Sequence, residues 1–171
     1  MIETEQNNPI EYFGTYPLPE AQIDRFLMKL NVGYPAHSEE SSILIRQKKI
    51  HPIESLNAVL ETTDILNIQE KVKEVEITPE MIDYMIKIVT LTRNMGDIKL
   101  GGSPRASLGL MNASRALALL EERDYVIPDD VTRVAPHVLR HRLTLSPKAK
   151  MSGITTEDII AKILTSVAIP T

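Results

Sequence analysis

Arg105 is the residue whose position most directly suggests chemistry. It follows Gly101-Gly102-Ser103-Pro104, in which Ser and Pro form a typical helix start. The first turn of a helix has unpaired amide N–H groups and a partial positive charge, so it favours an anion. A guanidinium in that turn adds a full charge and a planar set of donors that fits phosphate. The segment predicts an anion site, with an ordinary capped helix start and a solvated arginine as the alternative.

Two histidines, His137 and His141, are four residues apart and would lie on one helix face at the spacing of zinc ligands. No Glu follows His137, no third ligand is evident, and Arg140 and Arg142 would repel a cation. We therefore expect no metal site.

Basic residues are frequent in the same region, where Arg133, Lys148 and Lys150 add to the arginines. The region has no aromatic side chains on which bases could stack, so we predict a solvated or subunit-facing surface and no nucleic-acid site. The formal net charge of −4 also gives the chain no overall attraction for nucleic acid or anionic membranes.

The composition excludes several kinds of chemistry. The 171 residues include no cysteine, which removes disulfides, thiolate metal sites and thiol nucleophiles. No G-x-x-x-x-G-K-[ST] phosphate loop occurs, and no Ser, His and Asp form a convincing triad. The amino end is too polar for a secretory signal, and no apolar run approaches about 20 residues. A cytoplasmic location is expected.

The first 34 residues differ in character from the rest. They contain most of the aromatic residues and several prolines, which indicates loops with restricted backbone angles. We predict a short helix over 19–25 and a strand over 26–32. This strand would have no partner within the chain, so we expect residues 1–34 to be mobile, docked irregularly on the following domain, or paired with another copy.

From Ser38 onward the periodicity is helical. Helix starts are indicated at Thr78-Pro79, Ser103-Pro104, Pro128 and Thr155, and Pro136 should break or kink its helix. The apolar stripes predicted for the two central helices are Met81, Ile82, Met85, Ile86, Ile88 and Val89, and then Leu108, Met111, Ala113, Leu117 and Leu120. The predicted fold class is mainly α, a compact helical bundle.

Longer motifs resemble one family. The run N8-P-I-E-Y-F-G-T-Y-P-L-P-E-A-Q-I-D-R-F26, with V32-G-Y-P35, G101-G-S-P-R-A106 and R123-D-Y-V-I-P-D-D-V131, is similar to MoxR-type AAA+ ATPases. The resemblance covers nearly the whole chain in the right order. It implies a helical AAA+ lid bundle over residues 35–171. Residues 1–34 would be the end of the α/β ATPase core, a short loop and strand remnant.

The resemblance also implies roles for three residues. Asn8 and Arg25 are weak candidates on local grounds, since Asn before Pro is usually a turn residue and Arg beside Asp24 is usually a surface ion pair. In the family, Asn8 falls at sensor 1, which positions the attacking water, and Arg25 at the arginine finger that reaches a neighbouring subunit's nucleotide. Arg105 falls at sensor 2, which contacts the phosphates. Phosphoryl transfer requires such positioning and charge stabilisation.

The chain departs from the family in lacking Walker A and Walker B. It resembles the carboxy-terminal part of a longer enzyme that uses ATP and Mg²⁺, and we expect this chain alone to be inactive and to bind nucleotide weakly. The implied function is coupling of ATP hydrolysis to chaperone-like remodelling or maturation of client complexes in a ring of six subunits. The alternative is a non-enzymatic helical protein-interaction module.

Overall fold

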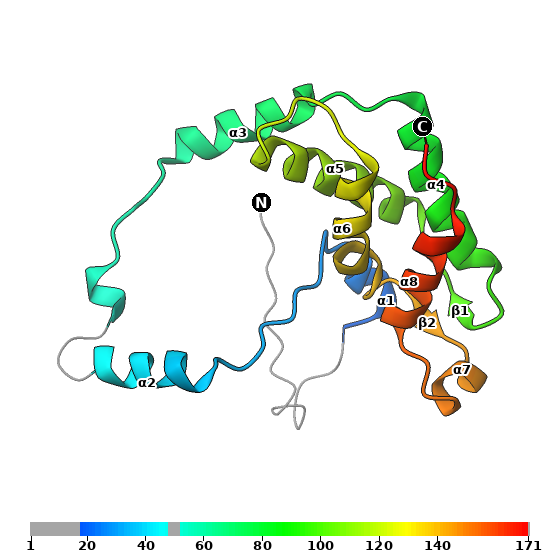
Figure 1. Ribbon diagram of the computed structural model, residues 1–171, viewed down its shortest axis with the longest axis horizontal. Coiled ribbons are helices and arrows are strands. Elements are labelled where there is room, and N and C mark those ends of the chain that lie inside the picture. Colours follow the sequence, from blue (N-terminus) through cyan, green and yellow to red (C-terminus); the bar gives the residue numbers. More distant parts are fainter. Residues whose placement is uncertain (1–17, 48–51, 171) are drawn as a thin grey trace. The chain divides into compact units, whose positions relative to one another are not determined.

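The computed structural model describes residues 18–47 and 52–170, and Asn8 lies outside these ranges. The chain divides into two compact units. The first comprises residues up to Lys29 together with those from Lys71 onward, and the second is Leu30–Glu70. Figure 1 labels the helices and strands.

The first unit is a helical bundle. It contains α1 (Glu20–Ile23), α4 (Pro79–Asn94), α5 (Pro104–Leu120), α6 (Pro128–Leu139), α7 (Pro147–Met151) and α8 (Thr156–Ser166). Helix α5 packs against α4 and α6, and α8 packs against α4 and α6 (Figure 1). Two short strands, β1 (Ile98–Leu100) and β2 (Thr144–Leu145), pair antiparallel with Ile98 opposite Leu145. The predicted mainly α lid fold is confirmed.

The predicted helix starts are present. Thr78 Oγ1 accepts a hydrogen bond from the Met81 amide at 3.3 Å, and Ser103 Oγ accepts one from the Arg105 amide at 3.2 Å. Thr155 and Asp158 form a capping box at the start of α8. Each arrangement satisfies amide groups that the helix itself leaves unpaired.

The core of the first unit joins α4, α5, α6 and α8. Its largest fully buried side chains include Tyr84, Met85, Ile88, Leu110, Val131, Val138, Leu139, Ile159, Ile160 and Ile163. On α4 the predicted stripe is largely correct, although Ile82 and Ile86 are exposed by 43% and 48%.

The predicted face of α5 is only partly correct: Ala113 is buried and Met111 and Leu117 pack against the core. Leu108 and Leu120 are exposed by 55% and 80%, and the helix buries mainly small residues, Ala106, Gly109, Leu110, Ala113, Ser114 and Ala118. Small side chains let α5 approach α6 closely, since a Cβ on Gly109 would lie 3.0 Å from Cγ1 of Val138. The face of α5 that allows close approach to α6 is therefore the buried one, and Leu108 and Leu120 on the other side remain exposed.

Two further predictions need correction. Helix α6 continues through Pro136 to Leu139, so the predicted break is absent, and the alternative, a kink at Pro136, stays a prediction. Residues 26–32 form no strand. The backbone of residues 26–29 is instead bonded to the end of α6 and the residues after it, which is the docked alternative among those considered for this segment.

The second unit contains α2 (His37–Arg46), the 3₁₀ helix η1 (Pro52–Ser55) and most of α3 (Thr62–Glu74), which continues into the first unit. Within their described residues α2 and α3 bury no side chain. Large apolar residues in this unit are exposed, among them Leu44, Leu56, Val59, Leu60 and Leu66. Among the described residues, no helix is both long and apolar enough to cross a membrane.

Candidate functional site

Arg105 lies in the first turn of α5, where the sequence placed it. The loop before it is held against α4: the Gly102 amide donates to Thr92 Oγ1 at 2.8 Å, and Arg93 Nε donates to the Gly102 carbonyl at 2.7 Å. The loop fits because Gly101 has no side chain, since a Cβ there would lie 2.7 Å from the Thr92 carbonyl oxygen. The Arg105 side chain remains 60% exposed, so its guanidinium is open to a ligand.

Asp24 connects this loop to the segment that contains Arg25. Ser103 Oγ donates to both carboxylate oxygens of Asp24, at 3.1 and 2.9 Å, while accepting the Arg105 amide. Arg105 Nη1 lies 3.6 Å from Asp24 Oδ2, and Arg142 Nε lies 3.3 Å from Asp24 Oδ1. One carboxylate therefore holds a helix cap and two arginines.

Arg142 is the buried member of this cluster, with its side chain 3% exposed. Its guanidinium donates to the carbonyl of Leu27 at 3.1 Å, of Asp24 at 3.2 Å, and of Phe26 and Val138. Burial lowers the pKa of Arg142, and the Asp24 carboxylate opposes that shift. The group stays charged, because a guanidinium does not lose its proton in a protein.

The two histidines hold the same segment. His141 Nε2 lies 3.0 Å from the Phe26 carbonyl oxygen, and the Lys29 amide donates to the His137 carbonyl at 2.9 Å. Nε2 faces a carbonyl oxygen and so carries a proton, while Nδ1 is buried without a partner among the described residues, which favours the neutral ring. Burial lowers the pKa of His141, in agreement with that tautomer. Among the described residues, no group of three His, Cys, Asp or Glu could hold a metal ion.

Comparison with known proteins agrees with this arrangement. Residues 90–163 match the family model "AAA lid domain", and residues 1–28 match "ATPase family associated with various cellular activities (AAA)". The uncharacterized protein YeaC of Bacillus subtilis is 48% identical over 95% of this chain and 51% of its own length. Chaperone MoxR1 of Mycobacterium tuberculosis is 46% identical over 95% of this chain and 45% of its own length.

The chain belongs to the MoxR-type AAA+ ATPase family. A solved structure described as an ATPase from Cytophaga hutchinsonii is similar to it, with a TM-score of 0.86 at 33% identity. The similarity covers 96% of this chain and 52% of that one. The chain thus spans about half the length of the relatives it matches.

Of the three site residues that the MoxR resemblance implied, two are described. Arg25 is exposed, and its side chain has no hydrogen-bond or ion-pair partner among the described residues. The surface ion pair between Arg25 and Asp24 that local reasoning suggested is absent there: the Asp24 carboxylate accepts hydrogen bonds from Ser103 and forms ion pairs with Arg105 and Arg142. Asp24 thereby connects the turn that contains Arg25 to the start of α5, where Arg105 lies.

Sequence reasoning missed the roles of Asp24 and Arg142. Arg142 was grouped with a basic surface, but it is buried, and two other members of that group pair with acids. Arg133 pairs with Glu121 at 2.9 Å and Arg140 with Glu157 at 3.7 Å. The signal that could have identified Arg142 is its position directly after the end of α6, where free carbonyl groups attract a cation.

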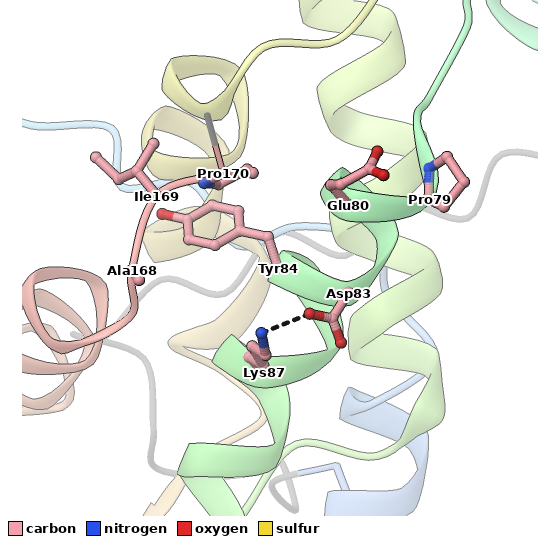
Figure 2. Close-up of a pocket in the computed structure, with 8 residues that line it drawn as sticks. All are labelled: Pro79, Glu80, Asp83, Tyr84, Lys87, Ala168, Ile169 and Pro170. Carbon is pink, nitrogen blue, oxygen red and sulfur yellow. Dashed lines mark ion pairs between the residues drawn. The ribbon is translucent and has the colours of Figure 1, made fainter.

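A groove elsewhere in the lid contains none of the predicted site residues. It has a volume of about 470 Å³ and is lined by Pro79, Glu80, Asp83, Tyr84, Lys87, Ala168, Ile169 and Pro170 (Figure 2). The Tyr84 hydroxyl in this groove is buried and has no hydrogen-bond partner within residues 18–47 and 52–170, and burial raises the pKa of Tyr84. Lys87 and Asp83 form an ion pair of 2.6 Å at the side of the groove.

Proposed function

We propose that this chain supplies the lid and the arginine finger of a MoxR-like ATPase, which couples ATP binding and hydrolysis to remodelling or maturation of client complexes. The observation that carries the proposal is the cluster around Asp24. An exposed arginine at the start of α5 and the exposed Arg25 belong to segments that share this one carboxylate.

Arg105 acts on the phosphates of ATP in this proposal. Its exposed guanidinium and the amino end of α5 together form a positive site of a kind that favours phosphate. Its contact with Asp24 is 3.6 Å long and largely solvated, so it is worth less than about 1 kcal/mol. A phosphate can therefore replace this carboxylate at little cost.

Arg25 acts on the nucleotide of a neighbouring subunit. An arginine supplied in trans stabilises the charge that develops during phosphoryl transfer, and in related enzymes it is worth about 10³–10⁵ in rate. An exposed position on a turn, with no partner of its own among the described residues, suits a group that must reach another subunit. We propose that Asn8 orients the attacking water.

ATP and Mg²⁺ require further groups. The described residues include no set of acidic or histidine ligands for a metal ion, and the whole sequence has no Walker A lysine. The described residues fit the phosphates through Arg105 and offer no ligand set for Mg²⁺. We propose that the metal is bound by the ATPase core of the intact enzyme, in a cytoplasmic ring of six subunits.

A second candidate function is a non-enzymatic interaction module. The exposed apolar residues of the second unit, such as Val59 at 93% and Leu56 at 76%, favour contact with another protein surface. The coding sequence upstream distinguishes the two candidates: in-frame Walker A and Walker B motifs support the ATPase, whereas a promoter and start codon directly at Met1 support the module.

The proposal is tested by nucleotide binding in an intact protein that contains this sequence together with Walker A and Walker B. Arg105→Ala should weaken ATP binding or slow hydrolysis by at least about tenfold, because a charged phosphate contact is lost. Arg133→Ala, which removes an exposed arginine paired with Glu121, is the matched control and should behave as wild type. Equal nucleotide affinity and turnover for Arg105→Ala and wild type would refute the role of Arg105.

A further inference from the structure

The turn that contains Arg25 closes around a single buried side chain. Arg142 donates to the carbonyl groups of Asp24, Phe26 and Leu27 and lies 3.3 Å from the Asp24 carboxylate. Carbonyls on both sides of Arg25 are therefore bonded to one guanidinium. The Arg25 side chain itself remains exposed.

The arrangement requires a guanidinium. Its planar group of five N–H donors can reach several carbonyls and a carboxylate at once, whereas the ammonium of lysine has three donors at one point. The same group also donates to the Val138 carbonyl in the last turn of α6. Arg142 thus connects the end of a core helix of the lid directly to the turn that contains Arg25.

The bonds are mutually dependent. A buried guanidinium is costly unless its donors are satisfied, and here most of its acceptors belong to the turn. Removing Arg142 would leave the Asp24 and Leu27 carbonyls without their side-chain donor and the Phe26 carbonyl with His141 alone. Releasing the turn would leave a buried charge without most of its acceptors. The turn and the end of α6 should therefore move as one body.

Arg105 differs from Arg142 in this respect. It touches the same carboxylate from the exposed side at 3.6 Å, with 60% of its side chain accessible, against 3% for Arg142. Arg105 can leave Asp24 for a ligand while Arg142 keeps the turn in place. On the Asp24 carboxylate, Arg105 therefore makes the contact that can be exchanged and Arg142 the contact that stays.

We propose that Arg142 is a positioning residue for Arg25. It attaches the turn that contains Arg25 to the end of α6, so that the orientation of the lid determines the orientation of the Arg25 side chain. This inference rests on the proposed function for the role of Arg25. The attachment of the turn to Arg142 can be tested without that function.

The first experiment uses the chain itself and measures tryptic cleavage of the Arg25–Phe26 bond by mass spectrometry under native conditions. A protease needs an extended local segment, and in the wild type the carbonyls on both sides of Arg25 are occupied by Arg142. Arg142→Met should accelerate cleavage after Arg25 by at least about tenfold, and Arg142→Lys should not restore the wild-type rate. Arg133→Met is the matched control and should cleave as wild type.

Cleavage after Lys87, inside core helix α4, reports unfolding of the whole bundle in the same digest. Faster cleavage after both Arg25 and Lys87 in Arg142→Met would indicate general unfolding. In that case Asp24→Asn provides the test of the attachment, because it changes a carboxylate at the partly exposed end of the cluster. Selective cleavage after Arg25 in Asp24→Asn supports the attachment. An unchanged rate at Arg25 in a folded Arg142→Met or Asp24→Asn protein overturns it.

The second experiment measures ATP turnover and nucleotide affinity in an intact enzyme that contains this sequence, for Arg25→Ala, Arg142→Lys and the double variant. If Arg142 acts through Arg25, Arg142→Lys lowers kcat at least about tenfold with unchanged nucleotide affinity. The double variant is then no slower than Arg25→Ala. Wild-type turnover for Arg25→Ala would refute the proposed function. Slow turnover for Arg25→Ala together with wild-type turnover for Arg142→Lys would refute the positioning role alone. Additive losses in the double variant would do the same.

Discussion

The carboxylate of Asp24 lies 3.6 Å from the guanidinium of Arg105, and the residue after Asp24 is Arg25. The predicted lid arginine thus contacts the residue next to the predicted finger. Because the contact is solvated and weak, a nucleotide phosphate that attracts Arg105 would compete with Asp24 for it. In the proposed function, nucleotide binding by Arg105 and presentation of Arg25 would therefore be connected through one carboxylate.

Replacement of Arg25 by Ala should affect turnover and spare nucleotide binding. In an intact ATPase containing this sequence, we expect a loss of at least about a hundredfold in phosphate release with nearly unchanged affinity. Mixing Arg25→Ala with a Walker-B-dead variant should restore part of the activity, since some interfaces then combine a functional nucleotide site with a functional finger. Arg105→Ala should not be rescued in this way if it acts within its own subunit. No recovery for Arg25→Ala, with mixed rings demonstrated, would exclude action in trans.

The chain alone should not hydrolyse ATP at a measurable rate. It has no Walker A loop, whose backbone amides and lysine hold the β- and γ-phosphates. Steady-state phosphate release from highly purified chain should equal that of a heat-treated sample. Release clearly above that background, removed by Arg105→Ala, would show that the chain holds a complete active site.

Gly101→Ala should disturb the loop that leads to Arg105. The added Cβ would lie 2.7 Å from the Thr92 carbonyl oxygen and 2.8 Å from the Arg93 backbone, neither of which can yield easily. We expect a loss of about 1–3 kcal/mol in the free energy of unfolding, measured by urea denaturation of the chain. Gly96→Ala is the matched control, because its Cβ would meet nothing within 4 Å and should change stability by less than about 0.5 kcal/mol. Equal stability of the two variants would contradict this account of the loop.

Asp130→Asn should destabilise the lid strongly. The carboxylate is 1% exposed, accepts hydrogen bonds from Arg123 at 2.9 and 2.6 Å, and accepts the Ile127 amide at 2.9 Å. The hydrogen bond to Asp130 also raises the pKa of Arg123. Breaking this pair leaves Arg123 without its partner, so the free energy of unfolding should decrease clearly. Glu121→Gln, which breaks the exposed pair with Arg133, should cost less than about 0.5 kcal/mol in the same urea titration.

His141 should make stability fall in mild acid. Burial lowers its pKa below the ordinary 6.5, so the unfolded chain takes up the proton first. Stability is therefore complete above about pH 7 and decreases as the pH falls through 6.5. Asp24, Lys29 and Arg142 are the charged groups nearby, and only Asp24 favours protonation. Between pH 7.5 and 5.5, the urea midpoint of His141→Gln should decrease less than that of the wild type.

The exposed His37 provides the control for this measurement. His37→Gln should reproduce the wild-type decrease, because the residue lies on an exposed helix of the second unit. An equal decrease for His141→Gln and the wild type would show that protonation of the His141 ring does not oppose folding.

Local signals predicted the helices well and the packing less well. Pro at the first helical position, preceded by Thr78 or Ser103, specified helix starts because caps act within three residues of chain. The buried face of α5 could not be predicted from hydrophobicity, since small residues there serve close approach to α6 and leave Leu108 exposed. That choice depends on the partner helix, which no local pattern specifies.

The site was predictable in part. Arg105 could be identified from its helix start, and Arg25 and Asn8 from a motif. The link between the segments could not be predicted, because Arg142 and Asp24 meet only in the folded chain. Local reasoning paired Asp24 with its neighbour Arg25, yet the stronger partner is a buried arginine. Phe26–Val32 has the alternation of a strand, but the carbonyls of Phe26 and Leu27 bond to side chains after α6.

The separation between Asp24 and Arg142 also affects synthesis of the protein. The two residues are 118 positions apart, so at translation rates of about 5–20 residues per second, roughly 6–24 s pass between their incorporation. During that interval the carbonyls of the turn have no guanidinium to bind. Closing so long a loop also costs entropy, which delays the contact further. A nascent or truncated chain without Arg142 would display Arg25 on a loose segment, and we expect Arg25 to be held in its final orientation only after Arg142 has been added to the chain.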